Sequence, residues 1–121
     1  MNAPAAVRVE QDPEVVVIRI AGELDLSNVR DLRHDILERV ENSALGVVVD
    51  LSEVAYLDSA GVQLLGDLAQ RLEWRGQRLA VAAASDSRAA RVLGMAGADA
   101  LFPLESAVEA ARERVVSHDE P

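Results

Sequence analysis

Three consecutive valines, Val47 to Val49, constrain the fold of this chain more than any other feature of its sequence. They lie between Gly46 and Asp50, and an unbroken apolar run of this kind is typical of a strand that is buried on both faces. Such strands occur inside sheets that are covered by helices on both sides. The sequence therefore predicts a central strand from Gly46 to Leu51 in a layered α/β domain.

The hydrophobic pattern changes soon after this strand, because apolar side chains now recur with a period of about 3.6 residues. The residues of this stripe are Val62, Leu65, Leu68, Ala69 and Leu72. They predict an amphipathic helix that begins within Asp58 to Gly61 and ends by Gly76. Either Asp58 or Ser59 can accept hydrogen bonds from the free amides of the first turn. We expect Ser59 to be exposed at this amino end, where the helix dipole favours negative charge such as a phosphate.

The remaining segments alternate between strand and helix patterns. Further strands are expected at 7–10, 15–21, 78–83 and 101–104. Further helices are expected from about residue 27, from about residue 85 to Gly97, and from the capping box at Ser106. The second of these is predicted to bury Ala89, Val92, Leu93 and Ala96. This alternation predicts an α/β domain with a mixed, largely parallel sheet of four to five strands and about four helices.

Composition limits the classes of function that are open to the chain. Its 121 residues are 50% apolar, which supports one domain with one core. We expect this domain to span 7–116, between a flexible tail at 1–6 and a flexible acidic tail at 117–121. The net charge of −9 argues against direct binding of nucleic acid and favours a partner with a basic surface. No apolar run reaches the roughly 20 residues that span a bilayer, and no signal peptide is recognisable, so we expect a cytoplasmic protein without membrane insertion.

The motifs of common enzymes are missing from the sequence. The chain has no cysteine and no lysine, which excludes a thiol nucleophile and a complete phosphate-binding loop. Ser59 does not lie in a Gly-x-Ser-x-Gly elbow, and neither His34 nor His118 is placed near it as a general base. Two histidines without ligand spacing do not indicate a metal site. We therefore predict a protein that is not an enzyme and has no cofactor.

Two short motifs and the order of the elements resemble the STAS family, the anti-sigma factor antagonists of bacterial partner-switching systems. The motifs are Gly22-Glu23-Leu24-Asp25 and Asp58-Ser59-Ala60-Gly61, and the resemblance covers about residues 7–114. In that family the serine after the aspartate of the second motif accepts a phosphate, so the resemblance implies phosphorylation of Ser59. Ala60 stands where the family commonly has a second hydroxyl, and no alternative acceptor is present there.

The resemblance also implies a partner and a surface. The partner would be an anti-sigma factor with serine kinase activity, and a PP2C-type phosphatase would act on the phosphorylated form. The implied partner-binding residues are Glu23, Asp25, Asp58, Ser59, Ala60 and Gly61. Asp25 is equally interpretable as a polar loop residue that helps to start the next helix. A second hypothesis is a STAS regulatory subunit of a lipid-transport ABC complex.

Trp74 leaves two interpretations open at the end of the Ser59 helix. It is either a core residue or an exposed anchor for a partner, because large aromatic side chains are common in interfaces.

Overall fold

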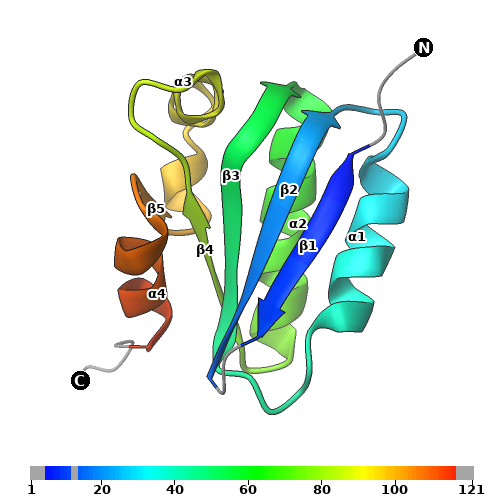
Figure 1. Cartoon of the computed structure of the whole chain (residues 1–121), viewed down its shortest axis with the longest axis vertical. Helices are drawn as coiled ribbons and strands as arrows, with labels where there is room; N and C mark the ends of the chain where they lie inside the picture. The colour runs from blue at the N-terminus through cyan, green and yellow to red at the C-terminus, as the bar shows by residue number, and fades with distance from the viewer. Residues whose placement is uncertain (1–4, 12–13, 117–121) are drawn as a thin grey trace.

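The computed structural model describes residues 5–11 and 14–116. Within them, five strands form one mixed sheet in the order β1-β2-β3-β4-β5 (Figure 1). β1 is antiparallel to β2, and the other neighbours pair in parallel. The strands are β1 (Ala6–Gln11), β2 (Val15–Leu24), β3 (Gly46–Leu57), β4 (Arg78–Ala82) and β5 (Leu104–Glu105). The helices are α1 (Val29–Arg39), α2 (Ser59–Trp74), α3 (Arg88–Met95) and α4 (Val108–Val116), with a 3₁₀ turn, η1 (Ala98–Ala100). The predicted fold class is confirmed.

The central strand is buried on both faces, as its valines predict. Val47 and Val49 belong to a large cluster that α1, α2 and α3 cover, while Val48 belongs to a smaller cluster under Ala111 and Val115 of α4. Neighbouring residues of a strand point to opposite faces, so one valine run supplies both layers of the core. Figure 1 shows α2 behind the sheet and α4 beside β4 and β5.

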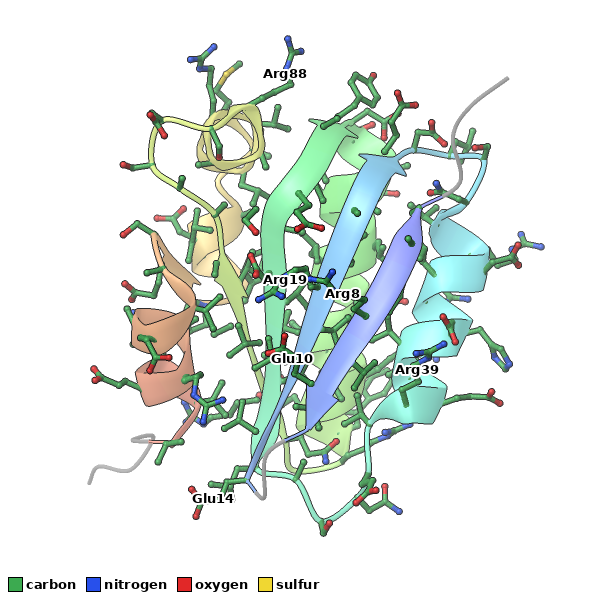
Figure 2. The ribbon with its side chains drawn as sticks, viewed as in Figure 1. Arg8, Glu10, Glu14, Arg19, Arg39 and Arg88 are labelled. Carbon is green, nitrogen blue, oxygen red and sulfur yellow. The ribbon has the colours of Figure 1, made fainter. Side chains whose placement is uncertain are left out.

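The α4 side of the sheet is covered only in part, and charged side chains occupy the rest of it. Arg19 donates from Nε to Oδ2 of the buried Asp50 at 2.7 Å and from Nη1 to Glu10 at 3.1 Å (Figure 2). Burial raises the pKa of Asp50, but hydrogen bonds from Arg19 and Ser52 and the charge of Arg19 outweigh this and leave that pKa below its usual value. This network links β1, β2 and β3 on the part of this face that α4 leaves uncovered.

The structure differs from the sequence prediction at several boundaries. β3 continues to Leu57, not to Leu51, because β2 also continues to Leu24 and pairs with the extension. The last strand is shifted to Leu104–Glu105, since residue 101 still belongs to the end of the 3₁₀ turn. The prediction that Ala96 is buried is wrong, because α3 ends at Met95 and Ala96 is its exposed C-cap.

Most of both predicted tails lies outside the described residues, namely 1–4 and 117–121. Ala5 is partly buried against the core, and β1 begins at Ala6. No helix in the described ranges combines the length and the apolar character needed to cross a bilayer.

Candidate functional site

The turn from β3 to α2 presents Ser59 at the start of a helix. Asp58 is the N-cap, and its Oδ1 accepts hydrogen bonds from the amides of Ala60 at 2.9 Å and Gly61 at 3.3 Å. Ser59 is the first residue of the helix and is exposed. Asp58, and not Ser59, is therefore the residue that caps α2. The Ser59 hydroxyl therefore has no capping role in α2.

Gly61 lets the amino end of α2 approach the sheet closely. A Cβ atom at this buried position would lie 2.5 Å from Cδ1 of Leu57 and 3.0 Å from Cβ of Leu24. Both distances are shorter than normal van der Waals contact, and Leu24 Cβ is close to the backbone and cannot move aside alone. Of the predicted partner-binding residues, Gly61 is thus a buried positioning residue, and the partly buried Ala60 lies beside it.

The second motif lies against the first at one edge of the sheet. β2 and β3 pair as Glu23 with Tyr56 and Leu24 with Leu57, and the amide of Asp58 donates to the carbonyl of Leu24 at 3.3 Å. The two strands are parallel, so their carboxyl ends meet at the same edge. This edge carries exposed loops and helix starts, which is where α/β proteins usually place functional groups.

Asp25 organises the loop between β2 and α1. Its Oδ1 accepts hydrogen bonds from the amide of Ser27 at 2.9 Å and from the hydroxyl at 2.5 Å. The side chain of Asn28 donates to the carbonyl of Glu23 at 2.7 Å and closes the same loop. Asp25 therefore does shape the start of the next helix, which is one of the two interpretations of this residue. A role in partner contact stays a proposal.

Exposed apolar side chains surround this edge, and sequence reasoning missed them. Leu26 and Met95 are each 81% exposed, and Tyr56 is 41% exposed. Met95 is off the apolar stripe of its helix, and Leu26 precedes the first turn of α1, so their positions could have indicated exposure.

Two hollows flank Ser59 on either side of α2. One, of about 740 Å³, lies between α1 and α2, and Leu26, Arg30, Ala60 and Gln63 are among its lining residues. The other, of about 380 Å³, lies between α2 and α3 and is lined by Ser59, Val62, Gln63, Val92, Met95 and Ala96. Together with the exposed apolar residues, they give the edge a shape and composition that suit contact with another protein.

Of the two histidines considered as a general base for Ser59, one lies within the described residues. His34 is exposed on α1, and its Nε2 lies 3.2 Å from Glu38. His118 lies outside the described residues. Across 5–11 and 14–116, no group of three or more histidine, cysteine, aspartate or glutamate residues could hold a metal ion.

Trp74 lies at the opposite end of α2 from Ser59 and is 74% exposed. The interpretation of Trp74 as a core residue is wrong, because other residues of α2 form the apolar stripe that packs against the sheet. Its separation from Ser59 by 15 residues, about 22 Å of helix, excludes it from the surface around the serine.

The chain is similar in sequence and in fold to proteins of a known family. The model of the STAS domain family matches residues 6–111. The anti-sigma-F factor antagonist RsfB of Mycobacterium tuberculosis is 32% identical over 108 residues, which cover 88% of this chain and 87% of RsfB. The crystal structure of an anti-sigma factor antagonist from Mycobacterium paratuberculosis is similar with a TM-score of 0.80 and 28% identity, over 95% of this chain and 98% of that one. The Bacillus cell fate determinant SpoIIAA in its phosphorylated form has a TM-score of 0.64 and 26% identity, over 91% of this chain and 99% of that one.

Proposed function

This chain belongs to the STAS domain family, and on that premise we propose that it is an anti-sigma factor antagonist controlled by phosphorylation of Ser59. The unmodified chain binds an anti-sigma factor that has serine kinase activity, and this binding releases a sigma factor. The kinase transfers a phosphate to Ser59 and ends the complex, and a PP2C-type phosphatase restores it. The cycle takes place in the cytoplasm.

The proposal rests on one observation: Ser59 is exposed, and its hydroxyl is not needed to cap α2, because Asp58 is the cap. Because Asp58 accepts the amides of the first turn, the Ser59 hydroxyl is available without disturbing the helix. A phosphate there meets the positive end of the dipole of α2, which tolerates the added charge. That a relative has been solved in a phosphorylated form adds support.

Repulsion and desolvation at the contact explain how the phosphate acts. It adds about −1.5 to −2 charge to the centre of the edge that carries Glu23, Asp25 and Asp58. A partner that packs closely on Ser59 would have to strip this charge of its water and bury it in the contact, which costs several kcal/mol. The switch requires no change of fold, because α2 is anchored by its core residues at a distance from the phosphate.

The proposal assigns no catalytic activity to the chain itself. Ser59 receives a phosphate from the partner's kinase site, so the general base and the ATP site belong to the partner. We expect no hydrolysis of esters or nucleotides by the purified chain.

Intact-mass analysis tests the identity of the phosphoacceptor. Each anti-sigma factor encoded by the same genome is purified and incubated with this chain and ATP. One of them is expected to add a single phosphate to the wild-type chain and none to Ser59→Ala. Two other exposed serines, Ser27 in the loop between β2 and α1 and Ser52 within β3, provide matched controls as Ser27→Ala and Ser52→Ala, and both should still gain one phosphate.

Two results would contradict the proposal. Phosphorylation that persists in Ser59→Ala would assign the wrong residue. Failure of every anti-sigma factor to bind or modify the chain, together with recovery of a transporter ATPase with it, would favour the regulatory subunit of a lipid-transport ABC complex instead.

A further inference from the structure

The arginines of this chain fall into two groups that differ in their partners. All 12 basic residues are arginine. Most of them have a carboxylate, a backbone carbonyl or another contact, namely Arg8, Arg19, Arg33, Arg39, Arg71, Arg75, Arg78, Arg112 and Arg114. Within the part of the chain that the structure describes, only Arg30, Arg88 and Arg91 make no ion pair or hydrogen bond through their side chains. All three are exposed.

These three arginines lie at the edge that carries Ser59. Arg30, on the first turn of α1, lines the hollow that also contains Ala60 and Gln63 of α2. Arg88 and Arg91 are on α3. They lie four residues before Val92 and Met95, which line the other hollow together with Ser59. Side chains four residues apart are neighbours on a helix surface. Figure 2 shows Arg88 extending from α3 beyond this edge of the sheet.

The residues around these arginines favour a protein as the ligand. The exposed Met95 and Leu26 lie beside them, and arginine and methionine are both enriched where proteins contact one another. Tyr56 is the one aromatic side chain exposed at this edge among the described residues, which gives no platform on which successive bases could stack. The net charge of −9 further disfavours a polyanion such as nucleic acid.

We propose that Arg30, Arg88 and Arg91 form a basic rim on both sides of Ser59, and that this rim docks against carboxylates of the anti-sigma factor. The inference rests on the proposed function and adds the chemistry of the partner's surface. The net charge of the whole chain favours a basic partner. Complementarity at a contact depends on the charges at that contact, however, and the three unpaired arginines favour acidic groups on the partner.

The rim contributes mainly to the rate and the specificity of association. Exposed guanidinium groups that have no partner within the chain lose no existing ion pair on docking. Rim charges of this kind steer diffusional encounter and exclude partners of the wrong sign. Steering explains how a molecule of strongly negative net charge approaches an acidic surface in one orientation, with Ser59 facing the kinase site.

A charge-reversal pair with a matched control tests the rim. The test variant is Arg88→Glu/Arg91→Glu, and the control is Arg39→Glu/Arg71→Glu, which changes the net charge equally at exposed, ion-paired arginines away from this edge. Association with the purified anti-sigma factor that binds the wild-type chain is measured by stopped flow at about 50 mM and about 500 mM salt. We expect the test variant to associate about tenfold more slowly at low salt, the control to stay within about twofold of wild type, and the difference to shrink at high salt.

Further variants make the result independent of any folding defect. Arg88→Ala/Arg91→Ala and Arg30→Glu should each slow association in the same direction by a smaller factor, with thermal unfolding unchanged. Replacement of the facing carboxylate of the anti-sigma factor by arginine should restore the rate of the Arg88→Glu/Arg91→Glu variant.

The outcomes separate this inference from the function on which it rests. If the wild-type chain binds the anti-sigma factor and the test and control variants associate at equal rates, the rim is refuted while the proposed function stands. A slower rate that is insensitive to salt refutes the rim as well, because a charge contact must weaken with screening. If the wild-type chain binds no anti-sigma factor, both proposals fall together.

Discussion

The two ends of α2 differ in how their polar groups are used. At the carboxyl end, Gln77 is buried and its Nε2 donates to the carbonyls of Glu41 at 2.8 Å and Ala44 at 3.0 Å. Arg75 lies beside it and donates to the carbonyls of Leu37 and Val40, both at 3.4 Å. At the amino end, Asp58 satisfies the helix and leaves the neighbouring Ser59 exposed.

We infer from this difference that the carboxyl end of α2 contributes to stability and the amino end to recognition. The carboxyl end fixes α2 to the end of α1 and to the loop after it through hydrogen bonds to backbone carbonyls. The amino end keeps its hydroxyl and its nearby cations available. A substitution at one end should therefore change the free energy of unfolding, and a substitution at the other should change affinity.

The largest expected effect is on affinity at Ser59. Ser59→Asp places a charge in the centre of the proposed contact, and we expect binding to the anti-sigma factor to weaken by roughly a hundredfold or more, about 3 kcal/mol. Gln70→Glu adds the same charge on the exposed face of the same helix, three turns away, and should bind like wild type. Calorimetry measures the affinity of both variants for the anti-sigma factor. Equal losses of affinity would show that the net charge of the chain matters and the position of the added charge does not.

The next effect is on stability at the other end. Gln77→Ala removes a buried side chain that donates to the carbonyls of Glu41 and Ala44, and we expect the free energy of unfolding to fall by about 2 kcal/mol. Affinity for the partner should be unchanged at temperatures where the variant is folded. Urea denaturation measures the loss, with Gln70→Ala on the exposed face as the neutral control. A variant that kept wild-type stability and lost affinity would reverse the assignment of the two ends.

A smaller and pH-dependent effect is expected on the charged side of the sheet. Asp50→Asn removes the ionised partner of Arg19, and we expect a loss of roughly 1 to 2 kcal/mol at pH 7. Because the pKa of folded Asp50 lies below its unfolded value of 3.8, its contribution is complete well above that pH and is lost as the pH falls through the lower, folded pKa. Wild type and variant should therefore converge in urea denaturation as the pH is lowered from 7 toward 3. A difference that grew on acidification would contradict a lowered pKa.

The smallest effects compare two adjacent residues of the helix start. Asp58→Ala removes the cap of α2 and should destabilise the chain by about 1 kcal/mol. Ser59→Ala removes an exposed hydroxyl with no capping role and should change stability by less than about 0.5 kcal/mol. Thermal unfolding of the two variants side by side tests the assignment. If Ser59→Ala were the more destabilised, Ser59 would be a structural residue after all.

Local patterns predicted the fold and the start of α2 well, because they depend on neighbours in sequence. The valine run specified a strand buried on both faces, and the change of period at Asp58 located the start of α2. The choice between Asp58 and Ser59 as the cap depended on backbone angles that a sequence does not contain. The length of β3 was underestimated because its second half is held by pairing with β2, a contact between distant segments.

The rest of the edge could not be predicted because it depends on tertiary placement. Arg33 is paired with Asp67 across two helices at 3.1 Å, whereas Arg30, one turn earlier on the same helix, has no such partner. Their sequence contexts are alike, and only the packing of α1 on α2 separates them. Met95 is an exception, because its position off the apolar stripe of α3 could have indicated that its side chain is exposed.

We propose that a phosphate on Ser59 switches off binding while the fold persists. The most direct test measures by calorimetry the affinity of one anti-sigma factor for the unmodified chain, the phosphorylated chain and the phosphorylated chain after treatment with a PP2C-type phosphatase. We predict tight binding, a loss of at least about a hundredfold, and full recovery, with the same circular dichroism spectrum throughout. Equal affinity of the folded unmodified and phosphorylated chains would show that phosphorylation of Ser59 does not control binding.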